Sequence, residues 1–223
     1  LFFGRRDRVR VTFALFSLAW GAIALLALRM QWSSDSAEAL RIARYMPGAV
    51  FATGYAALHY SLALTGLHRR GDVVLLGPLT VRRYFVLYTA GLAAATVVVM
   101  IAAVLEQNHL LRGVEFHPIL GYWLDFDPRA LVLQLPYGAL DAGMLLLLYR
   151  GMQQAGEPGQ RRFIRDNMIV FVLIKVSAML CIVILPYLGV PSFFFVFDLF
   201  AVAAFAFYGI IANHQYRQIE ELA

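Results

Sequence analysis

Five polar or ionisable residues stand inside long apolar runs of this chain: Tyr55, His59, Asp141, Lys175 and Asp198. A charged side chain at the centre of a bilayer costs about 2.5 kcal/mol or more, so such a residue normally faces the protein interior and has a partner. Asp141 and Lys175 lie at similar depths in consecutive runs, given a rise of about 1.5 Å per helical residue. We therefore expect these two to pair, and Asp198, nearer the outer end of the last run, to line an outward-opening cavity.

Two interpretations of these residues stay open. In the functional one, they form a polar site that binds a small lipophilic ligand or changes its protonation state. In the structural one, Asp141 and Lys175 form a static pair that fixes the register of two helices. The same choice applies to His59, which with Tyr55 and Tyr60 is either a ligand or proton site or, more commonly, a hydrogen-bonded packing element.

Metal binding and catalysis find no support in the residue pattern. Five candidate metal ligands occur in one segment, but their spacing matches no compact ligand motif: His109, Glu115, His117, Asp125 and Asp127. The chain has no nucleotide-binding glycine loop, serine elbow or HExxH sequence, and its single cysteine, Cys181, cannot pair within the chain. We predict no catalytic residue, no cofactor and no bound metal.

The elements that would position these residues are six apolar runs. Each is long enough to cross a bilayer core, which takes about 20 residues, and each should be helical because backbone groups in lipid must pair within the segment. The chain is 61% hydrophobic and 15% charged, unlike soluble domains with about 25% charged residues. The predicted fold class is all-α: a polytopic membrane helix bundle of six complete transmembrane helices, forming one domain over residues 1–213. The runs are approximately Val11–Leu28, Tyr45–Leu67, Tyr84–Leu105, Ala130–Tyr149, Met168–Leu188 and Val190–Ala212.

Arginine placement predicts the orientation. Thirteen arginines fall in Gly4–Arg10, His68–Arg83, Arg150–Asp166 and the tail, and five fall in the alternate segments. Because basic residues concentrate on the cytoplasmic side, we expect a multi-pass protein of the cell membrane with a cytoplasmic C-terminus. The net charge of +5 then reflects topology, so the lipid bilayer rather than nucleic acid is the expected partner. Leu1–Phe3 is either a short apolar lead or the end of an earlier helix, which would make seven spans.

Two segments between the apolar runs are predicted to lie on the external side of the membrane. Gln31–Arg44 is short enough for a turn or a small interfacial helix. Gln107–Arg129 is too apolar for a freely solvated loop, so we expect it to fold onto the bundle mouth or lie in the membrane interface.

The last run continues into a polar tail that predicts a signal-output helix over residues 214–223. Within it Tyr216 and Ile219 stand at the spacing of a coiled-coil seam, which is consistent with a homodimer through this helix. An ordinary amphipathic helix end would show the same short pattern.

Four stretches together resemble the N-terminal seven-transmembrane region of bacterial sensor histidine kinases and related membrane signalling proteins. They are GYWLDFDPRALVLQLPYGAL, LLLLYRGMQQAGEPGQRRFIRDN, ILPYLGVP and AFYGIIANHQYRQIEELA. The resemblance implies a sensory input module that detects a small or membrane-accessible signal and passes it through the last helix to a cytoplasmic output domain. The alternatives are a secondary transporter or proton-coupled carrier, and an accessory subunit of a membrane complex.

Overall fold

The structure is a computed structural model that describes residues 5–104, 111–119, 121–126, 130–180, 184, 185 and 188. Helices dominate it: α1 (Arg5–Gln31), α2 (Ser36–Ala43), α3 (Met46–Thr65), α4 (Val81–Val104), α5 (Ala130–Gln154) and α6 (Pro158–Met179), with a 3-10 turn η1 (Leu67–Arg69). Two antiparallel hairpins complete it: β1 (Val74–Leu76) with β2 (Leu79–Thr80), and β3 (Leu111–His117) with β4 (Gly121–Phe126). Five of the six apolar runs thus have a described helix, and the sixth, Val190–Ala212, lies outside the described residues.

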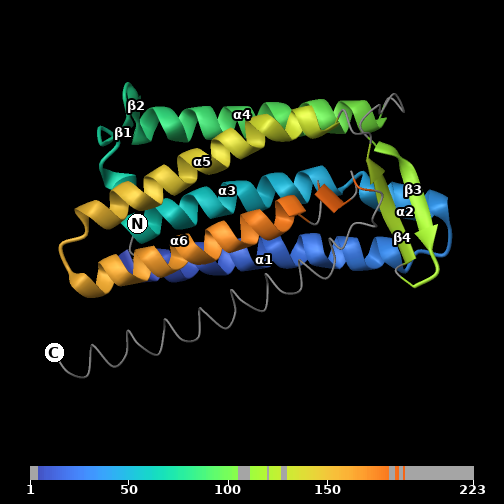
Figure 1. The fold of residues 1–223 in the computed structure, drawn as a ribbon, viewed down its shortest axis with the longest axis horizontal. Coiled ribbons are helices and arrows are strands. Elements are labelled where there is room, and N and C mark those ends of the chain that lie inside the picture. Colours follow the sequence, from blue (N-terminus) through green and yellow to red (C-terminus); the bar gives the residue numbers. More distant parts are fainter. Residues whose placement is uncertain are drawn as a thin grey trace.

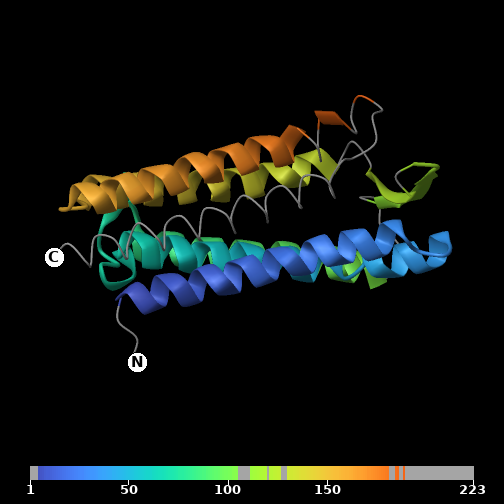
Figure 2. The same cartoon turned by 90° about the horizontal axis from the view of Figure 1, so that it is seen from below.

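The five long helices run up and down along one axis (Figure 1). Seen from below, α5 and α6 form one layer and α1 and α3 lie in another (Figure 2). Between the layers the core is apolar, and Leu58, Met144 and Leu147 are fully buried there. Burial of such apolar side chains is the main force that holds the helices together.

The β1–β2 hairpin closes one end of the bundle. Gly77 turns it with a positive φ of 51°, a conformation that favours glycine. Leu75 is buried, and its carbonyl oxygen accepts a hydrogen bond of 3.2 Å from Nε of Arg150 on α5. The hairpin is thereby fixed to the bundle.

The other end is covered by α2 and the β3–β4 hairpin, which together we call the cap (Figure 1). Val114 and Tyr122 of the hairpin pack against a cluster that includes Met30 of α1 and Ala39 of α2. A side chain at Gly121, whose φ is 73°, would collide with the end of α1. Of the turn or small interfacial helix expected within Gln31–Arg44, the structure has a small helix. The described part of Gln107–Arg129 packs onto the end of the bundle, which is one of its two predicted placements.

The predicted fold class is wrong in two respects. The cap and the β1–β2 hairpin add two small antiparallel sheets to a chain predicted to be all-α. Among the described residues, one helix is long and apolar enough to cross a membrane, the segment Arg8–Gln31 of α1, instead of the six predicted.

The physical reason for the second error lies in polar and charged residues that the helices contain. Helix α3 carries Thr53, Ser61 and Thr65, which are buried within the bundle. Helix α6 begins ten residues before the predicted start at Met168, and its first turns carry several charged side chains. Length and a high apolar fraction therefore overstated how many helices could cross a bilayer alone.

Candidate functional site

The predicted pair between Asp141 and Lys175 is confirmed. Nζ of Lys175 on α6 lies 2.7 Å from Oδ2 of Asp141 on α5, and the two side chains are 39% and 23% exposed. The ammonium group also lies 5.4 Å from the ring centre of Phe171, a favourable cation–π distance. The pair therefore links two helices from positions 34 residues apart, in surroundings that are only partly open to solvent.

Two glycines allow helix α5 to pack closely against α4 and α3. A Cβ atom at Gly143 would overlap the ring of Tyr84 on α4. One at Gly151 would overlap the side chain of Thr65 on α3. Because neither position has room for a larger residue, α5 sits in a fixed place against α3 and α4.

Helix α6 has a second polar attachment, which sequence analysis missed. The hydroxyl of Tyr60 on α3 donates a hydrogen bond of 2.6 Å to Oδ1 of Asn167, and both residues are buried. Nδ2 of Asn167 in turn donates to the carbonyl oxygen of Phe163 at 2.9 Å. The available signal was Asn167 itself, an amide next to the start of an apolar run, since a buried amide needs partners.

Tyr55 and His59 form a separate aromatic group. Their ring centres are 4.5 Å apart, and His59 is edge-on to Phe85 of α4 at 5.6 Å. Nε2 of His59 is buried and has no hydrogen-bond partner among the described residues. The structure thus places His59 on the α4 side of α3, whereas its neighbour Tyr60 contacts α6.

The remaining predicted site residues lie outside the described residues. They are Asp198, Tyr216 and Ile219. The cavity predicted at Asp198 and the seam predicted at Tyr216 and Ile219 stay predictions.

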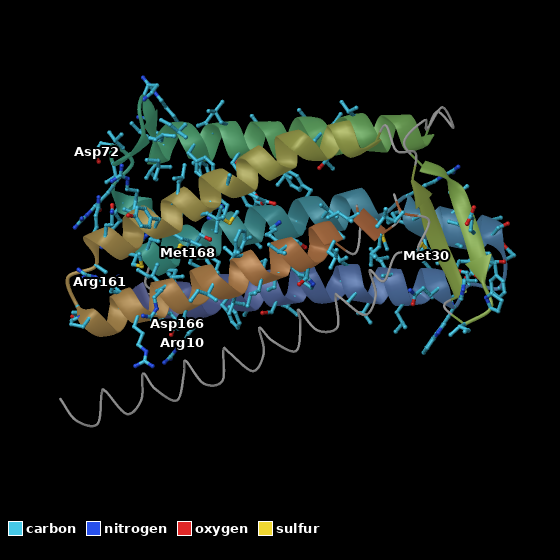
Figure 3. All side chains as sticks on the ribbon, viewed as in Figure 1. Arg10, Met30, Asp72, Arg161, Asp166 and Met168 are labelled. Atoms are coloured by element: carbon cyan, nitrogen blue, oxygen red, sulfur yellow. The ribbon has the colours of Figure 1, made fainter. Side chains whose placement is uncertain are left out.

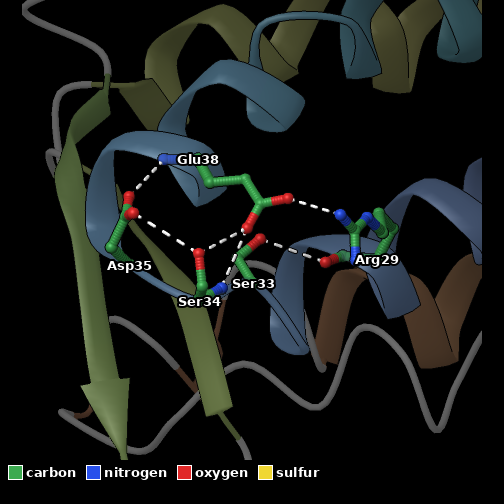
Figure 4. A network of polar contacts seen from close by, with 5 residues as sticks. All are labelled: Arg29, Ser33, Ser34, Asp35 and Glu38. Atoms are coloured by element: carbon green, nitrogen blue, oxygen red, sulfur yellow. Dashed lines mark hydrogen bonds and ion pairs between the residues drawn. The ribbon is translucent and has the colours of Figure 1, made fainter.

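The cap contains a second polar network, drawn in Figure 4. Asp35 accepts a hydrogen bond of 2.8 Å from the backbone nitrogen of Glu38, and Glu38 accepts one of 2.9 Å from that of Ser34. Asp35 is the N-cap of α2, and Glu38 reaches back to the residue before it, so this reciprocal arrangement is a capping box shifted by one residue, called the capping box below. Arg29 at the end of α1 pairs with Glu38.

These contacts shift both carboxylates of the capping box in the same direction. The backbone amide of Glu38 lowers the pKa of Asp35 below its ordinary value. The backbone amide and hydroxyl of Ser34 lower the pKa of Glu38. Both side chains are therefore ionised at neutral pH, and their role is to stabilise the cap.

In the part of the chain that the structure describes, no three His, Cys, Asp or Glu residues are grouped so as to hold a metal ion. Comparison with protein-family models, with curated proteins and with solved structures finds no match. The resemblance to sensor histidine kinases stays a prediction from the sequence.

Proposed function

We propose that this chain is a membrane-associated sensory input module. A small lipophilic signal would change how α6 packs on α5 and α3, and the segment after α6 would pass that change to an output domain. The observation that carries the proposal is the ion pair between Asp141 and Lys175, at 2.7 Å, across the α5–α6 contact.

The way α6 is attached makes it the element suited to move. Helix α6 is joined to α3 and α5 through the Asn167 and Lys175 side chains, beside the buried apolar residues Ile164, Phe171 and Ile174. The two polar contacts are directional, so a shift of α6 would break them or exchange their partners. A ligand that binds one arrangement better shifts the population toward it.

Apolar side chains on the outside of the bundle support contact with lipid. Monomeric soluble proteins rarely expose large contiguous apolar patches. Here exposed apolar residues recur on α1, α4 and α6, and α1 also contains the segment long and apolar enough to cross a membrane. Examples are Leu15, Leu18 and Leu25 on α1, Val86, Leu87, Val97 and Val98 on α4, and Ile169, Leu173 and Val176 on α6.

A fusion of the full chain to a histidine-kinase output domain tests the proposal. Asp141→Asn and Lys175→Met each remove one charge of the pair, and we expect both to change basal autophosphorylation in the same direction. The exchange Asp141→Lys/Lys175→Asp restores the attraction and should return the activity toward the parent value. The matched control is Glu38→Gln, which breaks the ion pair of the cap and should leave the output unchanged.

Two results would contradict the proposal. One is equal activity in the parent and all pair variants when each is shown to be folded and membrane-associated. The other is an equal response to Glu38→Gln, because that would mean that any lost ion pair perturbs the output.

A further inference from the structure

Three arginines line a pocket where α5 passes into α6. The pocket has a volume of about 460 Å³, and Met152, Gly156 and Pro158 complete its wall with Arg161, Arg162 and Arg165. Figure 3 shows Arg161 at the end of the bundle opposite Met30. Helix α1 brings further positive charge to this end, because Val9 packs against a cluster to which α3, α5 and α6 contribute, and Val9 is flanked by Arg8 and Arg10.

The carboxylate beside this pocket compensates only part of its charge. Asp166 lies 3.0 Å from Nη2 of Arg165 and 4.0 Å from Nε of Arg162, while Arg161 donates to the carbonyl oxygen of Ala155 at 3.3 Å. The side chains of Arg162 and Arg165 are 75% and 53% exposed. The three pocket arginines outnumber the two nearby carboxylates, Glu157 and Asp166, so the pocket keeps an excess of positive charge.

The same face of α6 continues as an apolar strip. Ile169, Leu173, Val176 and Leu180 are 49%, 61%, 62% and 46% exposed. At 100° per residue they share an arc of about 80° with Arg162 and Arg165. From Ile169 to Leu180 the strip rises about 17 Å, close to half of the ~30 Å hydrocarbon core of a bilayer.

We propose that this face binds an anionic phospholipid, with its phosphate at the arginine pocket and its acyl chains along the strip. Guanidinium groups suit phosphate because their planar fork offers paired donors. A soluble phosphate would leave the apolar strip uncovered, whereas one leaflet of lipid matches its length. By the same helical geometry Lys175 lies about 120° around α6 from the middle of the strip, so this site and the proposed sensor pair can each fail alone.

Native mass spectrometry of the full chain in neutral detergent tests the headgroup. The chain is given equal amounts of phosphatidylglycerol and phosphatidylcholine with identical acyl chains, and we expect it to retain phosphatidylglycerol preferentially. Arg162→Gln/Arg165→Gln should reduce that preference by up to about fivefold per arginine. The control Arg82→Gln/Arg83→Gln removes two exposed charges at the start of α4, and this variant should retain the preference for phosphatidylglycerol.

A second pair of variants tests the apolar strip. Leu173→Ser/Val176→Ser should lower retention of both lipids more than Val86→Ser/Leu87→Ser, which alters equally exposed residues on α4. Inorganic phosphate at millimolar concentration should not displace the lipid. Thermal melting first establishes that all variants fold. The proposal would then be overturned if the α6 variants and their α4 controls lost lipid retention equally. It would also be overturned if the parent showed no preference for phosphatidylglycerol, or if phosphate displaced the lipid.

Discussion

Two of the ion pairs among the described residues differ in what holds their partners in place. In the cap, Arg29 and Glu38 are nine residues apart, and Glu38 is already fixed by the backbone of Ser34. In the middle of the bundle, Asp141 and Lys175 come from two long helices and meet only when α5 and α6 are correctly packed. The first pair reports local folding, and the second reports the relative position of two helices.

This contrast separates a structural network from a candidate switch. A capping box forms from neighbouring residues and stabilises one helix end whatever the rest of the chain does. A long-range pair is stable in one arrangement of helices and lost in another, so it can bias an equilibrium between the two.

Gly151→Ala should have the largest effect, because its new methyl group meets Thr65 of α3. Overpacking of this kind costs about 1–3 kcal/mol of unfolding free energy. The control is Gly21→Ala in α1, where a Cβ would meet nothing within 4 Å. Circular dichroism melts should show a lower midpoint for the first and an equal or higher one for the second, and equal melting of the two would contradict the close packing of α5.

Tyr60→Phe should cause the next largest loss of unfolding free energy, because it removes a hydrogen-bond donor to the buried Oδ1 of Asn167. Removing one partner of a buried hydrogen bond costs about 1–3 kcal/mol. Tyr149→Phe, at a tyrosine that is 43% exposed, is the matched control and should be close to neutral. Denaturant titration measures both, and an unchanged midpoint for Tyr60→Phe would show that this bond does not hold α6.

Asp141→Asn should cost less, about 1–2 kcal/mol, because a half-exposed pair falls between surface and buried ion pairs. The variant leaves the Lys175 ammonium without its carboxylate. Asp72→Asn, an exposed carboxylate in the β1–β2 region, should be neutral in the same thermal melts. The double variant Asp141→Asn/Lys175→Met completes the comparison. If its loss of unfolding free energy equalled the sum of the losses in the two single variants, the two residues would not interact.

The cap should show the smallest effect, and only at acid pH. The folded-state pKa values of Asp35 and Glu38 are lowered, so their stabilisation is complete at neutral pH. It is lost as the pH falls below about 4 and through the depressed values. Hydrogen exchange at the amides of Ser34 and Glu38, corrected for intrinsic pH dependence, should then accelerate.

Asp35→Asn provides the control for that measurement. Asparagine still caps a helix but does not titrate, so exchange at Glu38 should lose most of its pH dependence. Identical acid behaviour in the parent and this variant would exclude Asp35 as the titrating group.

The sequence predicted helix positions better than it predicted their environment. Five of the six apolar runs lie within or overlap α1, α3, α4, α5 and α6, because each run is long enough for several helical turns. The number of membrane-crossing helices was overestimated, since run length does not show that residues such as Ser61 and Thr65 face a protein interior. The β3–β4 hairpin was also missed, because its mixed composition has no clear two-residue period.

At the candidate site, the charged residues were easier to foresee than the neutral ones. A lysine and an aspartate at similar depths in neighbouring runs suggested their pairing, and the structure contains it. The bond from Tyr60 to Asn167 joins positions 107 residues apart, and single-sequence patterns carry no information on which face of α3 meets α6. Tertiary packing decides such partners.

The distance between α5 and α6 tests the central claim most directly. Spin labels at Tyr149→Cys and Val172→Cys, in a Cys181→Ala background, allow it to be measured by double electron–electron resonance. We predict one narrow distribution in the parent, a second population in Asp141→Asn, and recovery of the first in Asp141→Lys/Lys175→Asp. Identical distributions in all three proteins would contradict the claim that this pair sets the position of α6.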